Sequence, residues 1–190
     1  ARQILEGYAA SDDQLQAVAL TPDTARDDLF FWANRLRNKY SQGCVSLCAI
    51  ASVQTGACSE DCAYCAQSSH HHTAVNPSEM TDEQVLHAVD QAARAGVRSF
   101  GLVTSGRALT PALLTRITRL AAQIKSRHAI RLCASLGALA PDQARRLRQG
   151  GIDRYHHNLE TSESFYSTIV TTHPYTDRLQ TLAAAAAAGM

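Results

Sequence analysis

The chain has 190 residues, of which 45% are hydrophobic, and a formal net charge of +1 at pH 7. This length can bury a sizeable core, either as one domain or as part of a larger one. The nearly balanced charge, without a run of basic residues, argues against nucleic-acid binding, and no apolar stretch reaches the about 20 residues that cross a membrane.

The first residues, ARQILEGYAASDD, lack the basic region, apolar core and cleavage pattern of a secretory signal. We therefore expect a cytoplasmic protein whose six cysteines are reduced thiols or metal ligands rather than a disulfide framework. SDDQ at 11–14 fits a helix capping box, and apolar residues recur at helical spacing from Leu29 to Tyr40. Residues 1–43 are thus predicted to be a helical segment whose apolar stripe packs on the rest of the fold.

After Gly43 the pattern changes to strands that alternate with helices. Strands are predicted at CVSLCAI (44–50), VRSFGLVTS (97–105), AIRLCASL (129–136) and DRYHHNLE (153–160). Helices are predicted between them at 81–96, from 110 onward, at 141–149 and at about 175–189, with capping residues, Pro or Gly at their ends. This alternation favours parallel pairing through right-handed crossovers, as in a β/α barrel or an open α/β sheet.

One side of each predicted strand carries small and polar residues. Alternation puts Cys48 with Ser46, Cys133 with Ser135, and His156 with Asn158 on such sides. A purely structural barrel fills its interior with bulky branched residues, so this pattern indicates a hollow lumen that holds ligands. The alternative is a sheet with one face in solvent, which the intervening helices disfavour.

The stretch ACSEDCAYCAQ holds three cysteines, Cys58, Cys62 and Cys65, in the spacing Cys-x3-Cys-x2-Cys. A structural zinc site needs four ligands, and no second cysteine or histidine pair stands at a suitable spacing. Three thiolates on a cubane iron-sulfur cluster leave one iron open to a small molecule. The loop therefore predicts a 4Fe-4S cluster with an open iron, and a zinc-binding module is the alternative.

This spacing, with the aromatic Tyr64 before the last cysteine, resembles the radical S-adenosylmethionine superfamily, and so implies its TIM-type β/α barrel. The resemblance implies that S-adenosylmethionine binds the open iron and that one electron cleaves its sulfonium to give a 5'-deoxyadenosyl radical. Tyr64 is then a cofactor-binding residue. The cofactors carry the difficult chemistry, and the protein positions them and keeps out water and oxygen.

Several blocks, CSEDCAYCAQS, VTSGRAL, LCASLGAL, YHHNLETS and TTHPYTDRLQTL, closely resemble the biotin synthase family in the same order. The resemblance implies sulfur insertion into dethiobiotin, with the sulfur drawn from an auxiliary iron-sulfur cluster, an electron donor such as flavodoxin or ferredoxin, and a homodimer. It places Asn158 and Glu160 by the nucleoside of S-adenosylmethionine and Arg178 by its carboxylate. A carboxylate suits two ribose hydroxyls and a guanidinium suits a carboxylate, although Arg178 could instead be a solvated residue near a helix start.

The sequence departs from the family where Gly101 stands at the position of an auxiliary-cluster cysteine. Cys133 matches a second auxiliary ligand, and a second subgroup of the family carries a cysteine at the position of Cys48. We therefore expect Cys48 and Cys133 to hold the auxiliary cluster, with buried, inert thiols as the alternative. Cys44 is left unassigned. His156 stands where many relatives have an asparagine that touches the substrate, which makes it a candidate substrate contact.

Three further histidines, His70, His71 and His72, follow the cysteine loop and are expected to lie in a solvated loop rather than to bind a metal. A full eight-unit barrel takes about 250 residues, so residues 44–190 are expected to hold its first four β/α units, the N-terminal part. Another biotin-synthase-like radical enzyme, such as a hydrogenase maturase relative, remains an alternative function.

Overall fold

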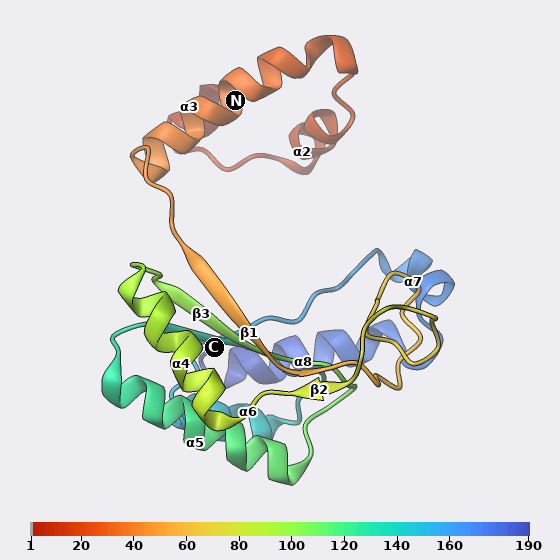
Figure 1. Ribbon diagram of the computed structural model, residues 1–190. Helices are drawn as coiled ribbons and strands as arrows, with labels where there is room; N and C mark the ends of the chain where they lie inside the picture. The colour runs from red at the N-terminus through yellow and green to blue at the C-terminus, as the bar shows by residue number, and fades with distance from the viewer. Residues whose placement is uncertain (1) are drawn as a thin grey trace. The chain divides into compact units, whose positions relative to one another are not determined.

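The computed structural model describes residues 2–190 and divides the chain into two compact units, with the boundary between Ser46 and Leu47 (Figure 1). The smaller unit is helical, as expected. Its elements are α1 (Arg2–Leu5), α2 (Asp12–Ala19), the 3-10 turn η1 (Asp23–Ala25) and α3 (Arg26–Ser41). The predicted capping box is present at the start of α2, where Ser11 and Gln14 bond each other's backbone N–H.

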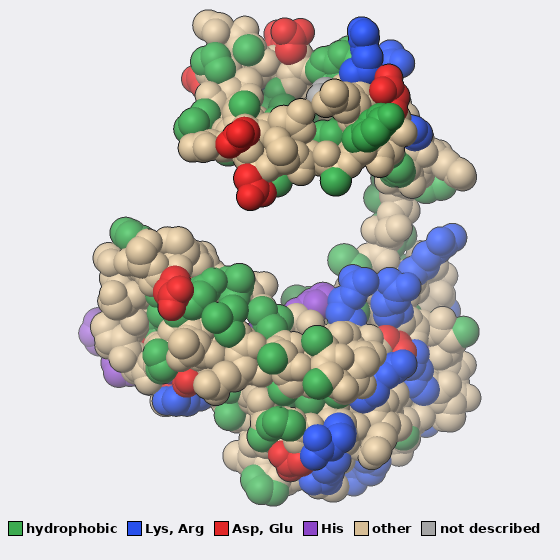
Figure 2. All heavy atoms as spheres, turned by 180° about the vertical axis from the view of Figure 1, so that it is seen from behind, with side chains coloured by type: hydrophobic (Ala, Val, Ile, Leu, Met, Phe, Trp, Pro, Cys, Tyr) green, Lys and Arg blue, Asp and Glu red, His purple; other side chains and the backbone are tan. Residues whose placement is uncertain are grey.

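The smaller unit buries none of its described residues, and Leu20 and Phe30 are among its exposed hydrophobic side chains. Figure 2 shows hydrophobic side chains on the surface of this unit. An amphipathic helix gains most of its stability by burying its apolar stripe against another element. The packing of this segment on the barrel remains a prediction.

The larger unit is built on a five-stranded sheet in the order β2-β1-β3-β4-β5. Four strands, β1 (Cys48–Thr55), β3 (Ser99–Thr104), β4 (Arg131–Ser135) and β5 (Arg154–Tyr155), pair in parallel, and β2 (Ser78–Glu79) adds an antiparallel edge. The connecting helices are α4 (Asp82–Arg94), α5 (Pro111–Arg127) and α6 (Pro141–Gln149), and α7 (Glu163–Ile169) and α8 (Tyr175–Ala187) follow β5. Sequential parallel strands with helical crossovers confirm the first four β/α units of a barrel.

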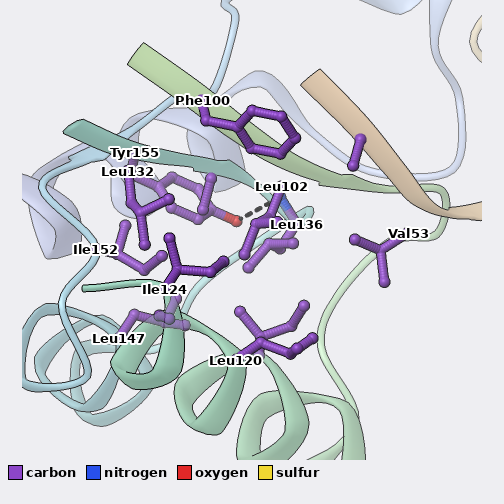
Figure 3. Close-up of a cluster of buried hydrophobic side chains, with 14 of the residues drawn as sticks. Val53, Phe100, Leu102, Leu120, Ile124, Leu132, Leu136, Leu147, Ile152 and Tyr155 are labelled. Carbon is purple, nitrogen blue, oxygen red and sulfur yellow. Dashed lines mark hydrogen bonds between the residues drawn. The ribbon is translucent and has the colours of Figure 1, made fainter. Parts of the chain in front are cut away.

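The core lies between the sheet and its helices. Phe100, Leu102 and Leu132 point from β3 and β4 toward Leu120 and Ile124 of α5 (Figure 3). Helix α5 begins as the sequence predicts, because Thr110 caps the N–H of Leu113 and Pro111 occupies the first helical position. The apolar side of each strand therefore faces the helices, and the opposite side of the sheet is left for function.

The clearest differences from the prediction are two strand boundaries and two short elements. The first strand begins at Cys48 rather than at 44, so Cys44 lies outside it. The last predicted strand ends at Tyr155, and the chain continues to Glu160 without regular structure. Neither the two-residue β2 nor the seven-residue α7 was predicted, because both are too short to show a periodic pattern.

The side of the sheet away from the helices carries the residues expected in the lumen. Cys48, Ile50 and Ser52 of β1 are exposed there, whereas Ala51 and Val53 are buried in the core. The alternation predicted from sequence is thus confirmed for this strand. None of the described helices is long and apolar enough to cross a membrane.

Candidate active site

The three-cysteine loop leaves the carboxyl end of β1 and is held by its own backbone. The Cys58 N–H donates to the carbonyl of Gln67 at 3.0 Å, and the Ser69 N–H donates to the carbonyl of Cys58 at 2.8 Å. At its entry Gly56 has φ +69°, and a Cβ there would lie 2.9 Å from the Cα of Pro77. The turn therefore needs glycine for both conformation and space.

The loop is also tied to the segment between α7 and α8. Asp61 accepts hydrogen bonds from the backbone N–H of Thr171 at 2.9 Å and of Thr172 at 3.3 Å. Bonds from Thr171, its side chain first, hold the pKa of Asp61 well below its usual range. The Ala63 N–H further donates to the carbonyl of Ile169 at 2.9 Å. Hydrogen bonds thus join the cysteine loop to a segment about 110 positions further along the chain.

The thiols of Cys58, Cys62 and Cys65 line one cavity of about 210 Å³. Burial raises the pKa of Cys62, and Arg178 opposes this rise. Neighbouring Cys65 and Cys58 raise it further. A thiolate set of this kind needs a positive partner, because like charges gathered in one place disfavour ionisation.

Three cysteine side chains that line one cavity are the donor set that a cubane cluster with one open iron needs. Within residues 2–190 no three His, Cys, Asp or Glu side chains converge on a point that a single metal ion could occupy. A cubane makes a different demand, since each thiolate binds its own iron at a separate corner. Cys58, Cys62 and Cys65 are the residues that would hold it.

Three of the predicted cofactor residues lie across the same cavity. Asn158, Glu160 and Arg178 all line it together with the cysteines, and so does Tyr64. Arg178 lies near the start of α8, where its Nη1 donates to the carbonyl of Asn158 at 2.8 Å and to Glu160 at 3.5 Å. Burial, followed by the Glu160 carboxylate, raises the pKa of Tyr64. The solvated alternative for Arg178 is wrong, because this side chain is 8% exposed.

The two histidines of the YHHNLE segment have different surroundings. His157 lines the cavity, and its pKa is lowered to about 4 by burial, by Arg178 and by His173. It is therefore neutral at physiological pH. His156 is exposed and is not among the residues that line the cavity, and its N–H donates to the carbonyl of Ala134 at 2.8 Å. The structure thus separates the candidate substrate contact from the candidate cofactor residues.

The candidate auxiliary ligands share that open side. Gly101 of β3 stands between Ile50 and Cys133 in register, and Cys48 lies two residues before Ile50 on the same side. Burial raises the pKa of Cys133, Arg154 and Arg131 lower it, and Cys48 is among the groups that raise it. A Cβ at Gly101 would meet the side chain of Ile50 at 3.1 Å. By strand alternation the two thiols therefore lie on the same side of the sheet, with β3 between their strands.

Two of the three loop histidines make bonds that were not expected. The Nε2 atom of His70 lies 3.1 Å from the carbonyl of Ser59, and that of His71 lies 3.0 Å from the carbonyl of Cys62. His72 is exposed. These histidines brace the cysteine loop from outside and do not line the cavity.

Sequence reasoning missed Glu60, Tyr166 and His173. The His173 Nδ1 atom bonds Glu60, and its Nε2 atom lies 2.7 Å from the hydroxyl of Tyr166. The only sequence signal was a carboxylate between two cysteines, which by itself does not name a partner more than 100 residues away.

Three thiols, a buried arginine and a carboxylate now meet in one cavity at the carboxyl ends of parallel strands. This is the arrangement that the resemblance to radical S-adenosylmethionine proteins predicts. Residues 52–190 match the family described as the Radical SAM superfamily, and the chain belongs to it. Membership implies a 4Fe-4S cluster and S-adenosylmethionine as cofactors.

Particular relatives sharpen this assignment. The chain is 41% identical to the biotin synthase of Carboxydothermus hydrogenoformans, covering all of this chain and 59% of that protein. It is 39% identical to the biotin synthase of Nitratidesulfovibrio vulgaris Hildenborough, covering all of this chain and 53% of that one. The chain therefore spans a little more than half the length of these curated relatives, both of which are biotin synthases.

Solved structures support the fold alone. Methylornithine synthase aligns with a TM-score of 0.84 over 99% of this chain and 56% of its own, at 19% identity. The hydrogenase maturase HydG from Carboxydothermus hydrogenoformans aligns with a TM-score of 0.76 over 100% of this chain and 46% of its own, at 19% identity. Both matches agree with the N-terminal part of a barrel.

Proposed function

We propose that the protein is a radical S-adenosylmethionine sulfurtransferase that converts dethiobiotin to biotin. The observation that carries this proposal is the identity of about 40% to biotin synthases, which runs through the whole chain. The two thiols on the open side of the sheet, Cys48 and Cys133, support it, because sulfur insertion needs a sulfur source near the substrate.

Each group of residues has a proposed task. Cys58, Cys62 and Cys65 hold the cluster, which supplies the electron that cleaves S-adenosylmethionine. Arg178 binds the carboxylate of S-adenosylmethionine, because its Nη2 donors are not taken by any residue in the described part of the chain. Asn158 and Glu160 hold the nucleoside.

The open side of the sheet is assigned to the substrate. Cys48 and Cys133 are the proposed ligands of the auxiliary cluster, and Gly101 stands on the strand between them. His156, on the same side, is the proposed hydrogen-bond donor to dethiobiotin. An electron donor such as flavodoxin or ferredoxin, a homodimer and a cytoplasmic location complete the proposal.

The test is anaerobic reconstitution of the full-length protein with iron and sulfide, followed by addition of S-adenosylmethionine, a reductant and dethiobiotin. Wild type is expected to form 5'-deoxyadenosine and biotin. Cys62→Ala is expected to form neither. Cys48→Ala is expected to form 5'-deoxyadenosine without biotin, and Cys44→Ala, the matched control in the smaller unit, is expected to form both.

Each contrary outcome has its own meaning. Cleavage of S-adenosylmethionine without biotin in wild type would refute the sulfurtransferase and favour another biotin-synthase-like radical enzyme, such as a hydrogenase maturase relative. Biotin formation by Cys48→Ala would refute the auxiliary ligand. One zinc per chain, with no iron and no charge-transfer absorption, would favour the zinc-binding module.

A further inference from the structure

We propose that Tyr166, His173 and Glu60 are positioning residues that hold Arg178 in a fixed relation to the cysteine loop. They do so through a continuous chain of hydrogen bonds between four side chains. The inference rests on the proposed role of Arg178 at the carboxylate of S-adenosylmethionine, and it adds the residues that orient that arginine.

An unbroken series of hydrogen bonds connects Arg178 to Glu60. The Arg178 Nε–H donates to the hydroxyl oxygen of Tyr166 at 2.6 Å. The Tyr166 hydroxyl lies 2.7 Å from the Nε2 atom of His173, whose Nδ1 atom bonds Glu60. Thr172 adds a donor to the same Glu60 oxygen at 2.6 Å. In the tautomer of His173 with its proton on Nδ1, every bond has one donor and one acceptor, because arginine can only donate and a carboxylate can only accept.

All four side chains are withdrawn from water. The Glu60, His173 and Arg178 side chains are 8%, 10% and 8% exposed, and Tyr166 is 2% exposed. Burying charged groups costs free energy unless each finds partners. A buried carboxylate and a buried guanidinium that are joined through two further side chains are therefore held in place, since the loss of any link leaves a buried polar atom unsatisfied.

The hydrogen bonds run from the cysteine loop to helix α8, and both of these elements line the cofactor cavity. Glu60 belongs to the cysteine loop, between Cys58 and Cys62, and Arg178 belongs to α8. Tyr166, on α7, also packs against Cys62. The bonds thus connect the residues proposed to hold the cluster with the residue proposed to bind the cofactor carboxylate.

The bonds also decide which donors of Arg178 remain available. Tyr166 takes Nε, and the Asn158 carbonyl takes Nη1. Two bonds to different atoms of a planar guanidinium fix its plane, so the Nη2 group has a single direction in which to meet a carboxylate. Removing the Tyr166 bond frees the plane to rotate and weakens carboxylate binding in particular.

The chain offers a matched pair of tyrosines for the test. Tyr166→Phe removes one hydroxyl and keeps the ring against Tyr175 and the guanidinium of Arg178. Tyr175→Phe removes a hydroxyl for which the described residues show no hydrogen bond, from a ring 5.4 Å away. The readouts are iron per chain and the affinity of the oxidised, cluster-loaded full-length protein for S-adenosylmethionine and for decarboxylated S-adenosylmethionine, measured by calorimetry.

Tyr166→Phe is expected to keep full iron content and to weaken S-adenosylmethionine binding about tenfold, which corresponds to ~1.4 kcal/mol. The affinity for the decarboxylated ligand is expected to change less than about twofold, because that ligand lacks the group that Arg178 binds. Tyr175→Phe is expected to match wild type in both. Unchanged S-adenosylmethionine affinity, an equal loss for both ligands, or loss of iron would each overturn the proposal.

A second variant tests the histidine between Tyr166 and Glu60 in this series of hydrogen bonds. His173→Phe keeps an aromatic ring beside Tyr166 and removes both nitrogens. It is expected to show the same selective loss of S-adenosylmethionine affinity with full iron content, and equal weakening of both ligands would count against the proposal. Neither readout depends on biotin formation. A protein that shows the Tyr166 effect but makes no biotin would therefore refute the sulfurtransferase and leave this inference standing.

Discussion

Tyr155→Phe tests how the sheet supports the cavity. Tyr155 lies on the core side of β5, and its hydroxyl bridges two backbone groups of the turn after β4. It accepts from the Leu136 N–H at 3.1 Å, the bond drawn in Figure 3, and donates to the Gly137 carbonyl at 2.6 Å. Gly137 lines the cofactor cavity, so one buried hydroxyl fixes part of its wall.

The expected cost follows from the burial of these groups. Leu136 is 1% exposed, so its N–H would lose its partner without access to water, which costs about 1–3 kcal/mol. The bond to the partly exposed Gly137 carbonyl adds about 0.5–1.5 kcal/mol. We expect Tyr155→Phe to lower the free energy of unfolding by about 2–3 kcal/mol, equivalent to about 5–10 °C in Tm for a unit of this size.

The assay is urea unfolding of the cluster-free protein followed by far-UV circular dichroism, with linear extrapolation to water. Tyr175→Phe serves as the control in the same unit, and we expect it to change the free energy of unfolding by less than about 0.5 kcal/mol. Equal values for the two variants would refute the reasoning that the Tyr155 hydroxyl satisfies buried backbone groups.

Two further predictions concern the loops and helices around this core. Asp82 bonds two arginines of α5, the first of which holds its pKa below the usual range. Its stabilising effect should therefore be present above about pH 4 and be lost as the pH falls further. The free-energy gap between wild type and Asp82→Asn should narrow from pH 6 to pH 3 in urea unfolding, while Asp142→Asn, at an exposed helix start, should show little gap at either pH. Gly96 and Gly137 both have positive φ, but of the two only Gly137 has a backbone atom, at 2.3 Å, that an added Cβ would meet. Gly96→Ala should lower the free energy of unfolding by about 1 kcal/mol, which is the cost of the left-handed conformation. Gly137→Ala should lower it several-fold more, because the steric clash adds to that cost. Similar losses for the two would contradict the steric argument.

The parts of the fold that sequence could predict are those with a local cause. Helix α4 begins at a capping box of Thr81 and Gln84, and α5 begins at Thr110 and Pro111, because these residues satisfy the first N–H groups or need none. The apolar face of each helix then follows from its period. By contrast, β5 ends after Tyr155 although the next residues keep the alternating pattern, because pairing with β4 stops there.

The site shows the same division. The cysteine spacing, Arg178 and the YHHNLE segment are recognisable as motifs, because each is a short run of residues. Glu60 and His173 could not be paired in this way, since the bond between them depends on where the segment before α8 returns to the cysteine loop. Such a contact is a property of the assembled fold, and no periodicity along the chain encodes it.

The proposed reaction needs two groups of residues, those that bind the cofactors and those that supply sulfur, and the structure places them in different surroundings. The cofactor cavity takes its lining from residues 58–178, and its charged groups are bonded to one another. The open side of the sheet has a different character, because Ile50 is 66% exposed there and Cys48 is exposed beside it. Changes at Tyr166 or Cys62 should therefore act on cofactor binding and cleavage, whereas changes at Cys48 should act only on the later transfer of sulfur. The loss of both steps in Cys48→Ala would show that the two faces of the site are coupled and that this separation is wrong.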